Sequence, residues 1–279
     1  MPFVQRTKWS GTPPRYLTRI AGVARFTRDF ATTAGVRAVG INCVRRSYVV
    51  QAIILAGGLG QRLKDRVPGV PKPLAPIRAR PFLEHLLDYL ILQGIHEVTL
   101  AIGYKGDAIK EHFGDRYRVL TIRYSSEQVP IGTGGAIRQA FGTTAFDSVF
   151  VMNGDTFVQA DFRRMETEHR MAGSSMTMAI KHVDDTSRYG TVNVKSGLVC
   201  SFESSARGSA GYINAGLYLV SRTLFDGCEL PDTFSFERDF LMPRVSRLRP
   251  HAFAVEGYFI DIGVPDDYER AQQELPDWR

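Results

Sequence analysis

From residue 51 onward, short continuous apolar runs alternate with apolar positions at helical spacing. Residues 51–56 form a β-branched apolar run that ends at two glycines, which is typical of a buried parallel strand. In residues 81–94, apolar side chains recur at helical spacing between a proline and a glycine, which predicts a helix. We expect further strands at 98–102, 120–124 and 148–152, and further helices at 105–113 and directly after Gly134-Gly135.

This alternation predicts an α/β fold built on a doubly wound, mostly parallel sheet of the Rossmann-like kind. From about residue 175, strands follow at close intervals before short helices and a final apolar turn at 258–262. No Gly/Ser linker separates the halves. We therefore expect residues 51–279 to form one domain with two lobes, about 51–174 and, with mixed strands, about 175–279. The strands expected in the second lobe are 176–181, 191–194, 198–203 and 212–220.

Residues 1–49 lack this pattern and carry the excess positive charge. Residues 1–50 contain nine Lys and Arg and one acid, whereas the remainder holds 26 basic and 28 acidic residues. The formal charge of +6 therefore gives no indication of a nucleic acid partner for the folded part. We expect a basic leader with little fixed structure. It resembles an organelle transit peptide or, as we favour, sequence upstream of a native start at Val50.

Cysteine, histidine and apolar content narrow the class further. Cys43, Cys200 and Cys228 are odd in number and form no C-x-x-C pair, which argues against a disulfide framework or a zinc site and fits a reducing compartment. The histidines show no metal-ligand spacing, and no run approaches the roughly 18 to 20 apolar residues needed to cross a bilayer. We expect a cytoplasmic protein that binds neither membrane nor nucleic acid. Whether it forms a homo-oligomer stays open.

A glycine-rich loop, Gly57-Gly58-Leu59-Gly60-Gln61-Arg62-Leu63, follows the first predicted strand. The backbone N–H groups of such a loop can approach phosphate oxygens, and Arg62 could neutralise a departing pyrophosphate, although the glycines alone also fit a tight turn. The P-loop sequence Gly-Lys-Ser/Thr is absent, and Leu63 stands where the dinucleotide fingerprint needs a third glycine. Neither an ATPase nor a dehydrogenase is favoured.

Two further segments carry groups suited to a nucleotide. Lys72 lies between Pro71 and Pro73, which should keep it out of a helix and present its ammonium group from a stiff loop. Residues 130–136 form a second glycine loop whose bare backbone could accommodate a flat nucleobase. Glu127 just before it could accept hydrogen bonds from a base with N–H donors, such as guanine. A solvated lysine and an exposed glutamate are the alternatives.

Two aspartates are candidate Mg²⁺ ligands. Asp155 closely follows the strand 148–152, at the carboxyl edge of the sheet where ligands bind. Asp261 lies in the apolar run 258–262, where a carboxylate is costly unless it meets a cation or hydrogen-bond donors. The pair could hold one metal ion, whereas a turn or capping role before Gly263 is the alternative for Asp261.

These segments together resemble the sugar-1-phosphate nucleotidyltransferase family over roughly residues 51–271, in particular its bacterial D-glycero-D-manno-heptose 1-phosphate and mannose-1-phosphate guanylyltransferases. The resemblance rests on G-G-x-G-x-R-L, P-K-P-L, P-x-G-T-G-G-A, N-G-D, Tyr189-Gly190, Tyr212-Ile-Asn-Ala-Gly216 and D-I-G-x-P-x-D-Y at 261–268. It implies Mg²⁺-dependent transfer of GMP from GTP to the heptose phosphate, which yields an NDP-sugar for capsule or lipopolysaccharide synthesis. The first lobe would bind the nucleotide and the second the sugar phosphate.

Carried over by matching position, the resemblance implies catalytic roles for Arg62, Lys72 and Asp155, and metal binding by Asp155 and Asp261. The residues implied for nucleotide binding are Ala56, Gly57, Gly58, Gly60, Glu127, Gly132, Thr133 and Gly134, and those for sugar-phosphate binding are Asn153, Tyr189, Gly190, Glu203 and Asn214.

Two residues depart from the family pattern. Gln61 stands where the family usually has Thr, and Ser204 follows Glu203 where many members have Lys. The second departure removes a cation near the sugar phosphate, so either Arg207 replaces it or the acceptor binds more weakly. We expect in-line attack without a covalent enzyme intermediate. The alternatives are a mannose-1-phosphate guanylyltransferase, another sugar-1-phosphate uridylyl- or thymidylyltransferase, and a catalytically silent sugar-nucleotide-binding regulator.

Overall fold

The computed structural model describes residues 51–58, 63, 66–203 and 208–278. The chain divides into two units, residues 1–45 and 46–279, and every described residue lies in the second. The expected leader 1–49 therefore lies outside the described residues, as do Gly60, Arg62, Ser204 and Arg207. Within the described part, no helix is both long and apolar enough to span a membrane.

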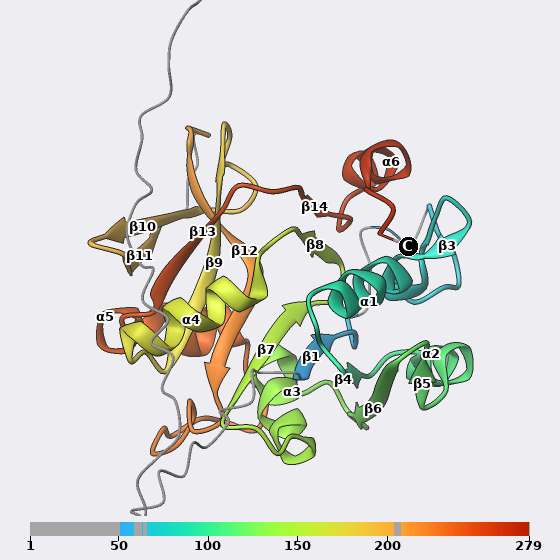
Figure 1. Cartoon of the computed structure of the whole chain (residues 1–279), viewed down its shortest axis with the longest axis horizontal. Helices are drawn as coiled ribbons and strands as arrows, with labels where there is room; N and C mark the ends of the chain where they lie inside the picture. Colours follow the sequence, from blue (N-terminus) through green and yellow to red (C-terminus); the bar gives the residue numbers. More distant parts are fainter. Residues whose placement is uncertain (1–50, 59–62, 64–65, 204–207, 279) are drawn as a thin grey trace, which may run out of the picture. The chain divides into compact units, whose positions relative to one another are not determined.

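A ten-stranded sheet runs through the second unit (Figure 1). One half contains β7 (Ser148–Asn153), β1 (Gln51–Leu55), β4 (Glu97–Ile102) and β6 (Leu120–Ser126), adjacent in this order and mutually parallel. The chain proceeds outward from β1 to β4 and β6, and β7 then pairs with the opposite side of β1. Strand order therefore reverses between β1 and β7. The predicted parallel, doubly wound arrangement is confirmed for this half.

The other half of the sheet mixes strand directions, as predicted. β12 (Gly211–Ser221) pairs antiparallel with β7 and continues the same sheet. Beyond it lie β9 (Met176–Val183), β13 (His251–Val255), β11 (Leu198–Glu203) and β10 (Thr191–Lys195). Of the neighbouring pairs described in this half, β9 and β13 pair parallel and the others antiparallel. A short strand, β5 (Arg116–Tyr117), ends the opposite edge.

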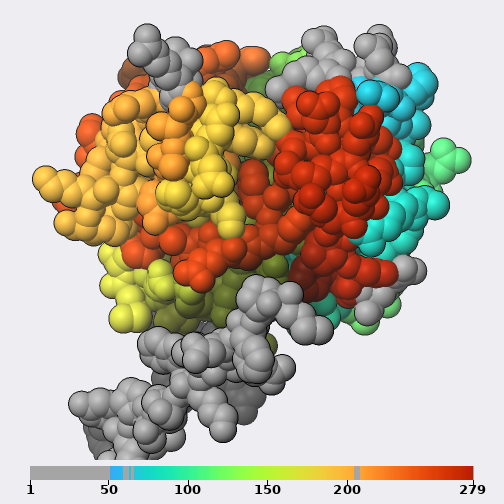
Figure 2. Space-filling model, turned by 90° about the horizontal axis from the view of Figure 1, so that it is seen from above, coloured from blue at the N-terminus to red at the C-terminus, as the bar shows by residue number. Residues whose placement is uncertain are grey.

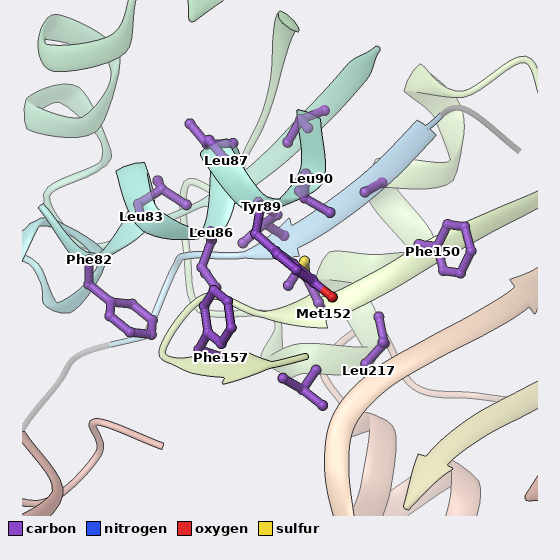
Figure 3. Packing of buried hydrophobic residues seen from close by; sticks show 14 of the residues in the cluster. Phe82, Leu83, Leu86, Leu87, Tyr89, Leu90, Phe150, Met152, Phe157 and Leu217 are labelled. Atoms are coloured by element: carbon purple, nitrogen blue, oxygen red, sulfur yellow. The ribbon is translucent and has the colours of Figure 1, made fainter. Parts of the chain in front are cut away.

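Helices cover both faces of the sheet, so that alternate residues of β1 are buried on opposite sides. Ala52 and Ile54 belong to one apolar core with residues of α1 (Phe82–Leu92), α2 (Gly106–Phe113) and α4 (Phe162–Ala172). Figure 3 shows this core, in which leucines of α1 pack near Phe157 and Met152. Ile53 belongs to the second core, which includes residues of α3 (Gly132–Ala140), the π-helical turn η4 (Phe236–Leu241) and α5 (Met242–Leu248).

The C-terminal residues return to the first half of the chain. In α6 (Pro265–Glu274), the Tyr268 hydroxyl donates to the Pro76 carbonyl at 2.7 Å, and Gln272 accepts the Arg78 N–H at 2.8 Å. Pro76 and Arg78 belong to the hairpin of β2 (Pro76–Ile77) and β3 (Arg80–Pro81) and its turn. In Figure 2 the C-terminal residues, in red, accordingly lie beside residues in cyan. These contacts fix the segment that carries Asp261.

Some local predictions need correction. The apolar turn expected at 258–262 contains a strand, β14 (Phe259–Asp261), which pairs with β8 (Thr156–Val158). The helix expected after Gly134-Gly135 begins at Gly132, so both glycines lie in its first turns. The pattern did not single out α4, whose outer face is strongly charged, or β13, which is only five residues long.

His169 in α4 makes the stability of this fold depend on pH. It is 5% exposed, and its Nδ1 lies 2.8 Å from the Thr177 hydroxyl. Burial lowers the pKa of His169 to about 4, with a smaller contribution from the charge of His251. The unfolded residue takes up a proton near pH 6.5, whereas the folded residue does so only near pH 4. Stability from neutral His169 is therefore complete above about pH 6.5 and declines as the pH falls toward 4.

We predict that the free energy of unfolding falls by about 2 kcal/mol more in wild type than in His169→Gln between pH 7.5 and pH 5, because glutamine does not titrate. Urea denaturation at both pH values measures the difference. His96→Gln, at an exposed histidine, should keep the wild-type pH dependence. Parallel pH profiles for wild type and His169→Gln would contradict the assignment.

Candidate functional site

A cleft of about 490 Å³ opens at the switch point between β1 and β7. Its walls include the ends of these strands, the start of α3 and residues of η4. The volume lies in the range of small-molecule sites, roughly 300–1,000 Å³. Of the residues singled out from the sequence, this cleft brings together Ala56, Gly57, Gly58, Lys72, Glu127, Gly132, Thr133, Asn153 and Asp155.

Asp155 reaches the cleft because the loop after β7 passes very close to β1. The Gly154 N–H donates to the Leu55 carbonyl at 2.9 Å. A Cβ atom on Gly154 would lie 2.6 Å from the same oxygen, which is too close for any side chain. Because Gly154 has no side chain, the ends of the parallel strands β1 and β7 can lie close together.

β14 places a second carboxylate beside Asp155. β8 begins directly after Asp155 and pairs with β14, so that Thr156 lies opposite Asp261. The Ile262 N–H donates to the Asp155 carbonyl at 2.9 Å. Burial raises the pKa of Asp261, and the negative charge of Asp155 raises it further, against smaller opposing effects of nearby cations and donors. The charge of Asp155 therefore opposes the ionisation of Asp261.

Lys72 partly offsets this repulsion. Its Nζ forms an ion pair with Oδ2 of Asp155, and its side chain is 11% exposed. A Cβ on Gly263 would lie 3.1 Å from this Nζ and 2.7 Å from Oδ1 of Asp261, so glycine leaves room for both groups. The prediction that the flanking prolines keep Lys72 out of a helix is wrong: it begins a single 3₁₀ turn, in which Pro73 is tolerated because the first turn needs no N–H from it.

Arg188, which sequence reasoning did not single out, contacts Asp261 as well. Its Nη2 lies 3.3 Å from Oδ2 of Asp261, and its Nη1 forms an ion pair with Asp267 in α6. The guanidinium group lies over the Tyr189 ring, 4.7 Å from its centroid. The only sequence signal for Arg188 is its position directly before Tyr189-Gly190.

Three of the residues expected to bind the sugar phosphate lie together but outside the cleft lining: Tyr189, Gly190 and Glu203. Tyr189 packs edge-on against Phe259 of β14, with ring centroids 5.9 Å apart. Gly190 adopts φ +77°, and a Cβ there would lie 3.0 Å from the Glu203 carbonyl. These residues gather where β10 pairs with β11, close to the segment that carries Asp261.

The second glycine segment packs against Phe234. The Gly134 N–H donates to the Phe234 carbonyl at 2.9 Å, and a Cβ on Gly134 would lie 2.1 Å from the Phe234 ring. The Thr133 hydroxyl accepts the Phe236 N–H at 2.9 Å. The Gly134 N–H is therefore engaged within the protein and Gly134 is not among the residues that line the cleft, so its role in nucleotide binding stays a prediction. Gly132 and Thr133, by contrast, line the cleft.

Glu127 connects the two glycine segments. Its Oε2 accepts the Ile131 N–H at 3.2 Å. Cβ atoms on Gly57 and Gly103 would lie 3.0 and 2.2 Å from Oε1, so the carboxylate lies across both glycines. Within the described residues Oε1 accepts no hydrogen bond, and it is available to a ligand's N–H groups.

Glu237 is a third carboxylate in the cleft, and the sequence reasoning missed it. Its Oε1 accepts hydrogen bonds from the Tyr218 hydroxyl at 2.9 Å and from Nδ2 of Asn214 at 3.0 Å. Burial raises the pKa of Glu237, the Tyr218 bond opposes this, and the charge of Asp155 adds to it. The sequence did carry a signal for Glu237. It lies about one helical turn before the buried Leu241, so an acidic residue stands on the apolar side of this segment.

The chemistry of Asp155 and Asp261 fits a hard divalent cation. Partly buried carboxylates that lie side by side offer oxygen donors whose charge a cation would compensate. Within the described residues, no group of three or more His, Cys, Asp or Glu side chains could hold a metal by itself. Two protein carboxylates completed by substrate phosphates are a common way to bind Mg²⁺.

Comparison with known proteins adds independent information. The family model described as Nucleotidyl transferase matches residues 51–277. A D-glycero-alpha-D-manno-heptose 1-phosphate guanylyltransferase from Aneurinibacillus thermoaerophilus is 44% identical over 226 residues, which cover 81% of this chain and 98% of that protein. The enzyme of the same name from Campylobacter jejuni is 44% identical over 220 residues, 78% of this chain and 97% of that protein.

More distant relatives and a solved structure agree with this. A mannose-1-phosphate guanylyltransferase from Mycobacterium tuberculosis is 30% identical and covers 82% of this chain and 65% of that protein. The crystal structure of HddC from Yersinia pseudotuberculosis superimposes with a TM-score of 0.73 at 34% identity, over 82% of this chain and all of that one. HddC complexed with GMP-PN superimposes with a TM-score of 0.72.

We predict that Gly134→Ala lowers the free energy of unfolding by about 1–3 kcal/mol, because the added methyl group must displace the Phe234 ring or the start of α3. Gly142→Ala is the matched control, since a Cβ there meets nothing within 4 Å and the residue lies in a helical turn. Chemical denaturation of both variants measures the difference. Equal stability of Gly134→Ala and wild type would show that this contact does not constrain the loop.

Proposed function

This chain belongs to the nucleotidyl transferase family, and we propose that it transfers GMP from GTP to D-glycero-alpha-D-manno-heptose 1-phosphate with release of pyrophosphate. The observation that carries the choice of substrates is the 44% identity to two proteins of that named activity over nearly their whole length. The same proposal assigns the GDP-heptose product to the synthesis of capsule or lipopolysaccharide.

The geometry at the switch point supports the reaction class. Lys72, Asp155 and Asp261 come from three separate segments and meet at one end of the parallel strands. A nucleotidyl transfer brings two polyanions together, so a cation held rigidly at this point lowers the cost of their approach. A phosphate monoester is already nucleophilic near neutral pH, and the reaction needs no covalent enzyme intermediate.

In the proposed reaction the residues of the chain bind and orient the two substrates. The glycine segment 57–58 and the N-terminal part of α3 hold the nucleotide, and Glu127 accepts hydrogen bonds from the guanine N–H groups. Lys72 exchanges its contact with Asp155 for contacts with the reacting phosphates. The sugar phosphate lies on the β12 side of the cleft, beside Asn153. The residues grouped around Tyr189 approach the site from the segment that carries Asp261.

Asp155 and Asp261 are the proposed ligands of Mg²⁺, which would screen the phosphate charges and polarise the α-phosphoryl group. The two aspartates hold the ion on the side of the cleft where Lys72 also lies. We propose a cytoplasmic location for the enzyme, in support of which the described cysteines, Cys200 and Cys228, are free thiols.

We predict that the purified protein releases pyrophosphate from GTP with D-glycero-alpha-D-manno-heptose 1-phosphate and Mg²⁺, and that excess EDTA abolishes the release. A coupled pyrophosphate assay with GTP, UTP, dTTP, CTP and ATP, each against heptose 1-phosphate and mannose 1-phosphate, measures the preference. Turnover with another pair would retain the reaction class and refute the proposed substrates. No release from any pair by folded protein would refute the enzyme and favour a regulatory role.

We predict that Lys72→Met lowers kcat by roughly 100-fold or more, because a preorganised charge at the reacting phosphates is lost while the fold loses only one partly buried ion pair. Lys195→Met, at an exposed lysine of β10, is the control for the change in net charge and should retain wild-type turnover. Circular dichroism and thermal denaturation establish that both variants fold. Near-normal kcat for folded Lys72→Met would rule out its assigned role.

A further inference from the structure

Glu237 is held rigidly with its side chain in the cleft. Ser235 caps the start of η4, and its side chain accepts the Arg238 N–H at 3.2 Å. Phe236, Phe240 and Leu241 are buried in the second core and fix the rotation of the turn about its axis. This anchoring leaves Glu237 among the residues that line the cleft.

Within the described residues, only one of the two carboxylate oxygens of Glu237 accepts hydrogen bonds from the protein. Both of its hydrogen bonds, from the Tyr218 hydroxyl and from Nδ2 of Asn214, end on Oε1. Nδ2 of Asn214 also donates to the Tyr218 hydroxyl at 2.6 Å, which closes the group into a triangle. In the part of the chain that the structure describes, Oε2 accepts no hydrogen bond. A carboxylate oxygen that faces a cleft and has no protein donor can accept a hydrogen bond from a ligand.

Asn214, expected from the sequence to bind the sugar phosphate, has no N–H group left for a ligand. Its Nδ2 donates to both Tyr218 and Glu237, and its Oδ1 accepts the Gly216 N–H at 3.1 Å. The pairing of β12 with β9 is irregular between Asn214 and Tyr218, and Gly216 adopts φ +70°. A local irregularity of this kind re-aims side chains, and here both residues point at Glu237.

We propose that Oε2 of Glu237 accepts a hydrogen bond from a hydroxyl group of the acceptor sugar, with Asn214 and Tyr218 as positioning residues that hold the carboxylate for this contact. The inference rests on the proposed function and adds a residue that selects the acceptor.

The surroundings favour a neutral hydroxyl donor. The negative charge of Asp155 acts on Glu237 as well, so a phosphate placed against Glu237 would be repelled. The order of strands favours the acceptor over the ribose. Asn214 and Tyr218 belong to β12, which lies on the far side of β7 from β1 and β4. The proposed nucleotide-binding residues lie on the other side of β7. Residues 57–58 follow the end of β1, and the Glu127 N–H donates to the Ile102 carbonyl of β4 at 2.9 Å.

The first test uses wild-type enzyme alone. The kcat/KM for heptose 1-phosphate is compared with the values for analogues that each lack one hydroxyl group. We expect one position to lower kcat/KM by about 10- to 100-fold, as for loss of a hydrogen bond to a charged group. Uniform values across the series would overturn the proposal whether or not any variant folds. Absence of turnover with the complete substrate would instead refute the proposed function, and this inference with it.

The second test assigns the sensitive hydroxyl to Glu237. Glu237→Gln should lower kcat/KM for the complete acceptor by a similar factor, leave the KM for GTP within about twofold, and lose nothing further with the sensitive deoxy analogue. Glu229→Gln, at an exposed glutamate, is the matched control. If Glu237→Gln does not fold, Glu237→Asp, which retracts the carboxylate by one methylene group, should show the same pattern. Losses that are equal for every analogue, or that fall on GTP, would overturn the assignment.

The positioning roles are tested by the dependence of one substitution on another. Tyr218→Phe should lower kcat/KM for the acceptor by about 2- to 10-fold in wild type, because Oε1 loses a donor. It should have little effect when combined with Glu237→Gln. A purely structural role for Tyr218 would lower kcat/KM equally in both backgrounds, which would contradict the proposal.

Discussion

The site depends on the repulsion between Asp155 and Asp261. Each carboxylate is placed by main-chain pairing, through the loop after β7 and through the β8–β14 ribbon, so neither can move away without breaking backbone hydrogen bonds. Burial strengthens the repulsion because less solvent screens it. Lys72 on one side and Arg188 on the other offset it in the protein alone. The fold thus holds two neighbouring carboxylates that Lys72 and Arg188 pair with in the protein alone, and in the proposed function Mg²⁺ would offset their repulsion further.

Close approach of backbones makes this convergence geometrically feasible. Gly154 lets β7 touch β1, and Gly263 makes room for an ammonium group and a carboxylate in one place. Gly134 performs a different task, because it receives the Phe234 ring and joins α3 to the segment before η4. The motif glycines therefore serve both packing and ligand approach, and only contacts in three dimensions separate these uses.

The sequence sufficed for the features that depend on local pattern. Apolar periodicity located β1, α1, β4 and β7 within one or two residues, and the rule for parallel sheets correctly brought Asp155 to the cleft. Features that depend on distant contacts were less accessible. The ribbon that carries Asp261 was predicted as a turn, since its three residues acquire strand geometry only by pairing with β8. Arg188 and Glu237 were missed for the same reason, because each owes its place to partners on other elements.

The distribution of carboxylates suggests how one cleft treats two anionic substrates differently. In the proposed function, Asp155 and Asp261 form the part of the site where phosphate groups and a cation would share charge. Glu237 and Glu127 lie on either side of it, and each retains an oxygen that accepts no hydrogen bond within the described residues. Carboxylates in such positions repel phosphates and attract neutral N–H and O–H donors. Under the proposed function, each polyanionic substrate would bind with its phosphate groups at the centre of the cleft and its neutral base or sugar beside Glu127 or Glu237. Selectivity and orientation then follow from the same electrostatic pattern.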